Sequence, residues 1–567
     1  MLALLSLSFF VSLLRASGRR LIPPLNTLPL QLLPRDGSIN ASTVSGITPV
    51  TVSSDRQTYF AVLQTGEMYF RVALDTGSSD LWIIGSSCTT SSCTAVPPYP
   101  LEYQSPTFGT VNNNKTLFEA RYADGTVASG FVATQSVRVA NVTVSEQAFA
   151  IVTDCNLTMT DDISGILGLG FPRLSSISAS VNGSTPFFSK LAQQGILEYP
   201  LFGVSLTKDA RGSLSLGAID TTIVTNVSKI DWNSVVEFPP IGAENNASSY
   251  LYWVTPLSAF AVNNTQMSPM PTYGSRTANS SLALIDIGTS GIYGPYPDVE
   301  RLFARIDGSR LVDDDGQWVI PCETTVPMSF TFGYVACGWQ LSSIPPSLTV
   351  PSQQTYTLEP TDYLIGPTSG DPAVCLSWPR ALAPSGDGID WQFGGPFLRT
   401  VYSIFSYGIN LKEAPRIGFY SLQNNTETVD ATAVKAFLSS VSATVATTLP
   451  NSLLPTPSIS TPEYVFNSSI QAPTGGIVSS ALATSTYSAI FGKKLSNVTS
   501  LPAITPAPTV TVVVTTNAEG ANTTFTSAIE ASFHLGLPPG WSAANGLHVS
   551  HLPVFSFVLL VVTTLIL

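Results

Sequence analysis

The sequence predicts a mainly β protein built from two similar halves with a few short helices. Three observations support this fold class. Strand-length runs rich in aliphatic and aromatic residues, for example 59–63, 68–74 and 326–332, are separated by Gly, Pro, Asn and Asp. Helical periodicity is limited to 187–194 and 296–306. A motif in which an apolar strand leads into Asp, Gly and hydroxyl residues occurs twice, at 73–79 and at 284–290.

The repeated motif gives each half one aspartate in the same local context. Asp75 and Asp286 stand at matching positions, and each motif is followed at long range by a second apolar segment ending in glycine, at 166–168 and at 393–394. A duplicated strand and turn of this kind indicates a bilobal molecule with pseudo-twofold symmetry. We therefore expect the two carboxylates to meet where the halves join.

The composition excludes several classes of function. All three histidines lie at or after residue 534, so residues 1–533 contain no Ser-His-Asp triad, no Cys-His pair and no histidine zinc site. Arginine and lysine number 25 against 37 acidic residues, without a basic run, which argues against a nucleic-acid partner. We expect no metal and no cofactor. Carboxylates remain as the groups for acid–base chemistry.

Residues around each aspartate suit that chemistry. Glycine after the strand end permits a tight turn whose backbone N–H faces the carboxylate. The hydroxyl of Ser78 or Thr289 can donate to the outer carboxylate oxygen and favour its charged form. Two facing carboxylates cannot readily both ionise, so they share one proton, and such a pair can deprotonate a water and protonate a carbonyl.

Five segments in order resemble those of the pepsin-like aspartic endopeptidases over about residues 49–423. They are Asp75-Thr-Gly-Ser-Ser-Asp-Leu-Trp82, 121–130 (Arg-Tyr-Ala-Asp-Gly-Thr-Val-Ala-Ser-Gly), 164–171 (Ser-Gly-Ile-Leu-Gly-Leu-Gly-Phe), 391–399 (Trp-Gln-Phe-Gly-Gly-Pro-Phe-Leu-Arg) and 416–419 (Arg-Ile-Gly-Phe). The sequence also resembles the fungal GPI-anchored (yapsin-like) members. This resemblance implies the bilobal double-barrel pepsin fold and hydrolysis of peptide bonds in peptides and proteins.

The resemblance also implies roles for individual residues. Asp75 and Asp286 would be catalytic, and Tyr122 would close over the substrate as part of a flap hairpin. The remaining residues implied in the site are Thr76, Gly77, Ser78, Gly288 and Thr289 in the two catalytic loops, Asp124 and Gly125 against the substrate backbone, and Trp82 packed behind the flap tyrosine.

Ile287 departs from the family pattern, which has Thr or Ser at this position. The missing hydroxyl normally bonds to the loop of the other lobe, and one lost hydrogen bond costs about 0.5–1.5 kcal/mol. An active acidic endopeptidase is the leading interpretation. The alternatives are a catalytically weakened pepsin-like binding protein and a structural cell-wall glycoprotein.

The six cysteines of a secreted chain suggest disulfides, and 15 connectivities are open to them. By the family resemblance, Cys88 pairs with Cys93 in a small loop and Cys322 pairs with Cys375. Cys155 and Cys337 remain as the third pair.

Both ends resemble targeting signals. Residues 1–18 are expected to be a secretory signal peptide, with a membrane anchor as the alternative. The apolar C-terminus, 546–567, has the form of a removed GPI signal, with Ser542 or Asn545 as attachment residue and a transmembrane helix as the alternative. Between the ends we expect a pro-segment at 19–48, an N-terminal lobe at 49–215, a C-terminal lobe at 216–425 and a stalk at 426–545. In 431–545, 35 of 115 residues are Ser or Thr and prolines recur, which predicts a disordered, O-glycosylated spacer.

Thirteen N-x-S/T sequons support a secreted glycoprotein. Their asparagines are Asn40, Asn114, Asn141, Asn156, Asn182, Asn226, Asn246, Asn263, Asn279, Asn424, Asn467, Asn497 and Asn522. We expect a monomer at the cell surface, held to the plasma membrane or cell wall through the GPI lipid.

Overall fold

The structure is a computed structural model of the whole chain, and its described residues all belong to the unit Thr43–Leu567. They are 44–208, 212–238, 249–275, 277–313, 315–333, 354–369, 371–383, 385–408, 413–423, 429–441, 501–506, 510–516, 522–528 and 534–541. The predicted signal peptide, nearly all of the predicted pro-segment, both proposed GPI attachment residues and the final apolar run lie outside them. Among the described helices none is long and apolar enough to cross a membrane.

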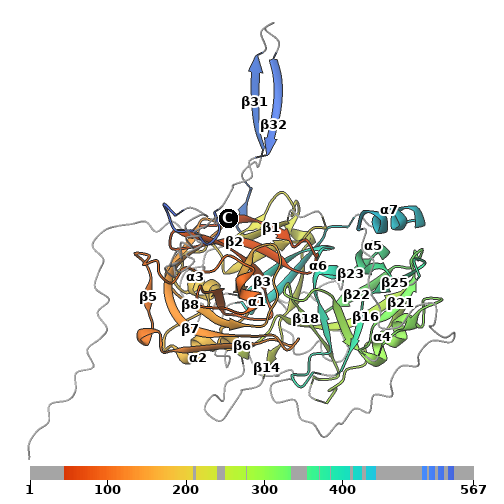
Figure 1. Ribbon diagram of the computed structural model, residues 1–567. Coiled ribbons are helices and arrows are strands. Elements are labelled where there is room, and N and C mark those ends of the chain that lie inside the picture. The colour runs from red at the N-terminus through yellow and green to blue at the C-terminus, as the bar shows by residue number, and fades with distance from the viewer. Residues whose placement is uncertain are drawn as a thin grey trace, which may run out of the picture. The chain divides into compact units, whose positions relative to one another are not determined.

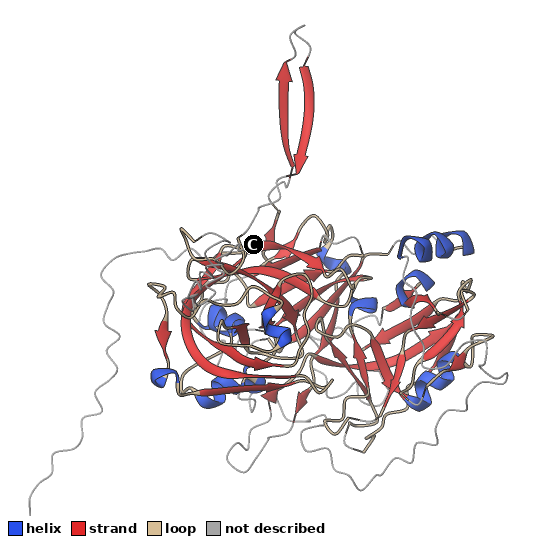
Figure 2. Ribbon diagram, in the orientation of Figure 1, coloured by secondary structure: helices blue, strands red, loops and turns tan. Residues whose placement is uncertain are grey.

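The chain is mainly β, as the sequence predicts (Figure 1), and Figure 2 shows strands far outnumbering helices. The predicted helical segments at 187–194 and 296–306 correspond to the described helices α3 and α4. The described α-helices are α1 (Ser91–Thr94), α2 (Ser176–Ser180), α3 (Phe187–Gln193), α4 (Tyr296–Phe303), α5 (Pro360–Tyr363), α6 (Gly395–Leu398) and α7 (Ala431–Val441).

The largest sheet in the described part of the chain has 14 strands and includes strands from both halves. Its order is β13-β29-β28-β10-β11-β1-β2-β3-β9-β4-β8-β7-β5, with β6 paired to β7, and an additional pairing joins β2 to β7. The bounds are β1 (Gly46–Val52), β2 (Tyr59–Thr65), β3 (Met68–Asp75), β4 (Leu81–Ile84), β5 (Gly109–Thr110), β6 (Leu117–Arg121), β7 (Val127–Val139), β8 (Val142–Cys155), β9 (Ile163–Gly168), β10 (Leu201–Ser205), β11 (Gly212–Leu216), β13 (Asp231–Ser234), β28 (Val401–Ser406) and β29 (Arg416–Ser421).

The second half is built on an eight-stranded sheet in the order β23-β22-β16-β18-β27-β19-β26, with β17 paired to β16. Its strands are β16 (Val254–Val262), β17 (Thr265–Met267), β18 (Ser281–Ile285), β19 (Ile292–Pro295), β22 (Met328–Phe332), β23 (Thr355–Leu358), β26 (Arg380–Leu382) and β27 (Trp391–Phe393). A four-stranded sheet contains β20 (Arg310–Leu311), β21 (Trp318–Pro321), β25 (Val374–Ser377) and β24 (Leu364–Pro367). Two-stranded pairs are β12 (Ile219–Asp220) with β30 (Ala503–Ile504), β14 (Glu237–Phe238) with β15 (Ser249–Tyr250), and β31 (Val510–Thr516) with β32 (Asn522–Ala528).

The two halves repeat one strand arrangement, which confirms the predicted pseudo-symmetry. In the first half, β3 runs parallel to β9, and β9 pairs antiparallel with β4. In the second half, β18 runs parallel to β27, and β27 pairs antiparallel with β19. The apolar segments at 166–168 and 393–394 therefore lie beside the two motif strands, as the repeat in the sequence suggested.

The hydrophobic core explains why these segments form strands. In β3, the side chains of Met68, Phe70 and Val72 are buried while those of Tyr69 and Arg71 are half-buried, which is the alternation of a strand with one face in the core. The main apolar cluster extends over both halves and includes Phe202, Trp253 and Phe405. Their rings pack at centroid separations of 4.8–6.1 Å, which joins the halves through aromatic contacts.

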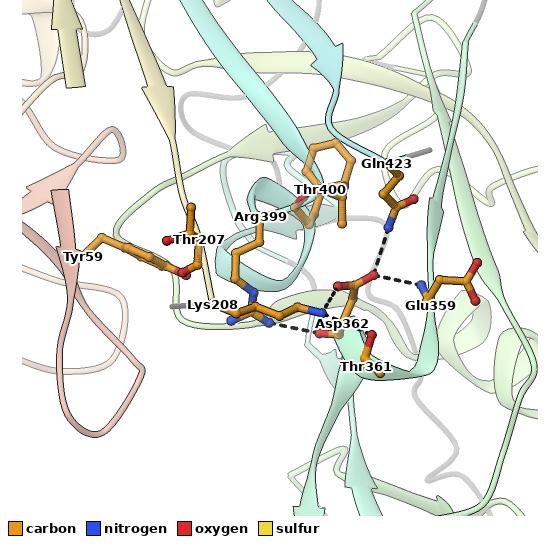
Figure 3. Close-up of polar contacts among 10 residues, drawn as sticks. Tyr59, Thr207, Lys208, Glu359, Thr361, Asp362, Arg399, Thr400 and Gln423 are labelled. Atoms are coloured by element: carbon orange, nitrogen blue, oxygen red, sulfur yellow. Dashed lines mark hydrogen bonds and ion pairs between the residues drawn. The ribbon is translucent and has the colours of Figure 1, made fainter. Parts of the chain in front are cut away.

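A polar cluster also links the halves, and Figure 3 shows the side chains of Lys208 and Gln423 directed at Asp362 of α5. Lys208, in the turn after β10, places Nζ 2.6 Å from Oδ1 of Asp362. Gln423 Nε2 and the backbone nitrogen of Glu359 each lie 3.0 Å from Oδ2 of Asp362. Because the Asp362 side chain is only 6% exposed, these donors compensate a nearly buried carboxylate.

The region after residue 425 departs from the predicted stalk in its described parts. Helix α7 buries Val434 completely in the main core cluster. Strand β30 pairs in parallel with β12, and Leu501 packs against the cluster that contains Ile219. Trp541 packs edge-on against Tyr103, with ring centroids 6.2 Å apart. These segments form a helix and a strand where the sequence predicts a disordered spacer, because sparse apolar residues in a Ser/Thr-rich region pack against the body of the protein.

Candidate active site

Asp75 and Asp286 occupy equivalent places at the ends of the two motif strands. Asp75 ends β3 opposite Gly168 of β9, and Asp286 follows β18 where Ile285 is opposite Phe393. A glycine beside each motif strand, Gly168 in β9 and Gly394 after β27, allows the loop that carries the aspartate to approach closely. A Cβ atom on Gly168 would lie 2.4 Å from the carbonyl carbon of Ser79, and one on Gly394 would lie 1.9 Å from the carbonyl oxygen of Thr289.

Each carboxylate accepts hydrogen bonds from an equivalent set of donors in its own loop. The N–H of Gly77 donates to Oδ1 of Asp75 at 2.8 Å, and the hydroxyl of Ser78 donates to Oδ2. In the second loop, the N–H of Gly288 donates to Oδ1 of Asp286 at 3.0 Å, and the hydroxyl of Thr289 donates to Oδ2 at 2.7 Å. The four donors are those expected from the residue types in the sequence.

The two carboxyl groups lie next to each other, although 211 positions separate them in the sequence. A Cβ atom on Gly77 would lie 2.9 Å from Oδ2 of Asp286 and 3.2 Å from Oδ1 of Asp75. Both residues are only 7% exposed. Burial and then the charge of Asp286 raise the pKa of Asp75, outweighing the hydrogen bonds from Ser78 and Gly77. The pair therefore retains a proton in a pH range where an exposed aspartate is ionised.

Thr76 ties the first loop to the second. Its hydroxyl lies 3.1 Å from the carbonyl oxygen of Ile285 and 3.1 Å from Oδ1 of Asp286, and it accepts the N–H of Ile287 at 3.0 Å. Ile287 has no hydroxyl, and its buried side chain belongs to the main core cluster. The connection between the loops is therefore asymmetric. The looser hold on the carboxylate pair that Ile287 suggests stays a prediction.

Tyr122 lies over the first loop. It follows β6 in the turn that leads to β7, and Nε1 of Trp82 donates to its hydroxyl at 2.7 Å. Burial and then the charge of Asp75 raise the pKa of Tyr122, while hydrogen bonds from Trp82 and Ser78 act in the opposite direction. The hairpin that carries Tyr122 is therefore placed beside Asp75, as the flap comparison implied.

The tip of this hairpin is a tight turn. Oδ1 of Asp124 accepts the N–H of Thr126 at 2.9 Å, and the N–H of Gly125 donates to the carbonyl of Tyr122 at 3.0 Å. Asp124 and Gly125 are both exposed, so the turn leaves them accessible to a bound peptide.

Comparison with known proteins agrees with this geometry. The family model for eukaryotic aspartyl protease matches residues 58–419, which include both loops and the hairpin. The chain belongs to the eukaryotic aspartyl protease family. It is therefore an aspartic-type endopeptidase that acts on peptides or proteins.

Three relatives of this aspartyl protease show how far the similarity extends. It is 27% identical to an aspartic protease of Phaffia rhodozyma over 388 residues, which cover 67% of this chain and 80% of the relative. It is 28% identical to cathepsin E of Mus musculus over 361 residues, covering 62% of this chain and 78% of the relative. It is 27% identical to endothiapepsin of Cryphonectria parasitica over 380 residues, covering 66% and 74%.

The two disulfides implied by the resemblance are present in this aspartyl protease. Cys88 pairs with Cys93, and Cys322 pairs with Cys375. Cys155 is buried and is not bonded to a described cysteine, and its predicted partner Cys337 lies outside the described residues. The third pairing stays a prediction.

Two aromatic residues of the second half brace the first loop of the aspartyl protease, and sequence reasoning missed both. Nε1 of Trp253 donates to the carbonyl of Leu169 at 3.0 Å, and the hydroxyl of Tyr407 donates to the same carbonyl at 2.8 Å. The N–H of Leu169 in turn donates to the carbonyl of Asp75 at 2.7 Å. Neither ring lies in a recognisable motif, so no signal in the sequence identifies them.

Sequons on the described surface of the aspartyl protease are accessible. The asparagines whose side chains are described are all exposed: Asn114, Asn141, Asn156, Asn182, Asn226, Asn263 and Asn279. The side chains of the other six, Asn40, Asn246, Asn424, Asn467, Asn497 and Asn522, lie outside the described set.

Proposed function

We propose that this chain is a secreted, surface-anchored endopeptidase that hydrolyses peptide bonds at acidic pH, with Asp75 and Asp286 as its catalytic pair. The observation that carries the proposal is the matched set of donors around two adjacent carboxylates. Gly77 and Ser78 hold one, and Gly288 and Thr289 hold the other. An arrangement that treats both acids alike suits a pair that exchanges acid and base roles.

The proton balance of the reaction follows from the shared proton. The ionised carboxyl takes a proton from a water molecule as the water oxygen attacks the peptide carbonyl, and the protonated carboxyl gives its proton to the carbonyl oxygen. Collapse of the tetrahedral intermediate moves a proton to the leaving amine and regenerates the pair with one proton. Both steps need one ionised and one neutral carboxyl, which is the state that a raised pKa favours in acid.

Tyr122 and the turn at Asp124 and Gly125 act as the flap in this proposal. The bond from Trp82 fixes the phenol beside Asp75, so closure of the hairpin would exclude water from the reacting groups. The exposed turn would contact the substrate backbone.

The decisive experiment is digestion of a denatured protein between pH 3 and 5 by the wild type and by Asp75→Asn and Asp286→Asn. Cleavage by the wild type that a statine-type inhibitor blocks, and loss of cleavage in both variants, would support the proposal. Cleavage that survives either substitution would refute it.

Secretion and anchoring require separate evidence. Exposed sequon asparagines and paired cysteines support passage through the secretory pathway. The terminal sequences support a cleaved signal and a GPI lipid in the yapsin-like manner. N-terminal sequencing of the mature protein, and release from cells by a phosphatidylinositol-specific phospholipase, test these two points. A mature protein that retains its C-terminal apolar run would contradict the anchor.

Ile287 favours one alternative function, a catalytically weakened binding protein. Of the two described loops, the first supplies the hydroxyl of Thr76 to their connection and the second has Ile287 at the matching position, so the carboxylate pair is held less firmly than two hydroxyls would hold it. Binding of a statine-type inhibitor without turnover of any protein substrate would favour this alternative. Brisk turnover would exclude it.

A further inference from the structure

The flap hairpin of this protein is joined to the end of β8 by a side-chain hydrogen bond as well as by backbone hydrogen bonds. Strand β7 leaves the flap turn at Val127 and pairs antiparallel with β8, whose last residue in the register is Cys155, opposite Ala128. The next rung of this ladder joins Val127 to Asn156. In a regular antiparallel rung of this kind, the two residues exchange both of their N–H to carbonyl bonds.

Only half of this rung is made by backbone groups. The N–H of Asn156 donates to the carbonyl of Val127 at 3.3 Å. The N–H of Val127 donates instead to the side-chain Oδ1 of Asn156, at 2.7 Å. Because the amide oxygen replaces the backbone carbonyl, β8 can end and the chain can turn away while the base of the flap keeps both bonds.

The rung lies between the flap and a rigid part of the first half. Cys155 is buried, and its carbonyl accepts the hydroxyl of Thr90 at 2.9 Å, from the loop closed by the Cys88–Cys93 disulfide. Tyr122 packs on the same apolar cluster as Cys155. Asn156 therefore connects the braced end of β8 to Val127, which follows Tyr122 by five residues in the hairpin.

We propose that Asn156 is a flap-positioning residue, whose side-chain oxygen holds the base of the flap in the orientation that places Tyr122 beside Asp75. The proposal rests on the flap role given under the proposed function. It concerns a residue that touches neither the reacting groups nor the flap tip.

The same asparagine heads the sequon Asn156-Leu-Thr158, and both ends of this sequon are exposed. An N-linked glycan is attached through Nδ2, which leaves Oδ1 able to accept the N–H of Val127. No described residue accepts a hydrogen bond from this Nδ2. The side chain of Asn156 can therefore carry a glycan and position the flap at the same time. An experiment must separate the effects of these two roles.

Three variants of the full chain separate the two roles. Asn156→Ala removes both the acceptor and the sequon. Asn156→Asp removes the sequon but keeps an acceptor oxygen, since a carboxyl accepts in its neutral and its charged form. Thr158→Ala removes the glycan and keeps Asn156. The readouts are kcat and KM on a peptide substrate, the inhibition constant of a statine-type inhibitor, and hydrogen exchange of the peptide containing Val127.

We expect Asn156→Ala to raise KM and the inhibition constant about 2- to 12-fold, the range that one lost hydrogen bond gives. The value of kcat should change less, because saturating substrate closes the flap again. Exchange at Val127 should become faster in this variant. Asn156→Asp and Thr158→Ala should behave like the wild type in all three readouts.

Two results would overturn the proposal. If Asn156→Ala has the same kinetic constants and the same hydrogen exchange at Val127 as the wild type, the side chain of Asn156 does not position the flap. Equal changes in Asn156→Ala and Thr158→Ala would assign the effect to the glycan. If the wild type cleaves no substrate, the proposed function fails by itself. Hydrogen exchange at Val127, compared between the wild type and Asn156→Ala, still decides whether the side chain of Asn156 holds the base of the hairpin.

Discussion

The hydroxyl oxygen of Thr76 lies 3.0 Å from the backbone nitrogen of Ile287, and Ile287 offers no hydroxyl in return. Thr76 also donates toward the carbonyl of Ile285 and toward Asp286. One side chain of the first half thus orients the loop of the second, whereas the second half contributes an isoleucine buried in the core. The two aspartate loops therefore differ in the hydroxyl that each supplies to the connection between them.

Substituting Ile287→Thr should strengthen the weaker side of the connection. A hydroxyl at this position can reach the first loop, and one hydrogen bond is worth about 0.5–1.5 kcal/mol, which corresponds to about 2- to 12-fold in a rate. We expect kcat to rise within that range when peptide cleavage is measured at acidic pH. Ile287→Val is the matched control, because it keeps the branched shape without the hydroxyl. A rise in both variants would attribute the effect to side-chain volume.

Substituting Thr76→Val should have the opposite and larger effect. The change keeps the shape of the side chain but removes the hydroxyl that contacts Ile285, Asp286 and Ile287. We expect the free energy of unfolding to fall by about 1–3 kcal/mol because buried partners lose their bonds. The value of kcat should fall about 10- to 100-fold, because small displacements of reacting groups are costly. Thr76→Ser retains the hydroxyl and should retain most activity.

Buried carboxyl groups should make the folded protein more stable in acid than at neutral pH. Burial raises the pKa of Asp298 to about 6, and the bonds from Met270 and Arg301 do not offset it. Between about pH 4 and that value the folded state binds more protons than the unfolded state, so stability is lost as the pH rises through this window. The raised pKa of Asp75 acts with the same sign.

Asp298→Asn tests this dependence away from the catalytic loops. Because the Asp298 side chain is fully buried, its ionisation costs up to about 3 kcal/mol between pH 4 and 7. The melting temperature of the variant, relative to the wild type, should therefore rise across this range. A constant difference would show that Asp298 does not titrate there. Under the proposed function, cleavage should fall on the alkaline side in both proteins, because the pair of Asp75 and Asp286 loses its shared proton there.

Much of the fold and of the site could be predicted because duplication leaves local patterns. An apolar strand, Asp, Gly and a hydroxyl residue occur together at Asp75 and again at Asp286, and each loop makes the bonds that its own residue types allow. The disulfide from Cys88 to Cys93 closes a loop of neighbouring residues. Contacts between residues that are close in the sequence can therefore be predicted from it.

Features that depend on distant partners could not be predicted. Tyr407 reaches the carbonyl of Leu169, and Asn156 reaches Val127, through pairings that only the folded sheet creates. The described segments after residue 425 were misjudged for a related reason. Composition describes the average of a segment, whereas individual apolar residues such as Val434 and Leu501 pack against apolar clusters of the body.

The ion pair of Lys208 with Asp362 should matter more than a surface pair. Asp362 is nearly buried, so Lys208→Met would leave its carboxylate with only the bonds from Gln423 and Glu359 (Figure 3). Because Lys208 is about one third exposed, solvent reduces the effect, and we expect a loss of about 1–3 kcal/mol in urea unfolding. Adding Asp362→Asn to Lys208→Met should restore part of the loss, because the buried charge is then absent. No recovery in the double variant would contradict a buried-charge origin.

The pairing of β30 with β12 predicts that the region after residue 441 contributes to the stability of the peptidase. Pro502 and Ile504 accept the N–H groups of Ile219 and Thr221 at 2.9 and 3.0 Å. Leu501 packs against an apolar cluster that contains residues of both halves. Leu501→Asp should lower the free energy of unfolding by about 1–2 kcal/mol, the cost of exposing a half-buried leucine and introducing a charge. Leu501→Met preserves the apolar contact and is the control. A chain that ends at residue 441 should lose at least as much, and the same melting temperature as the full chain would mean that the region is only a spacer.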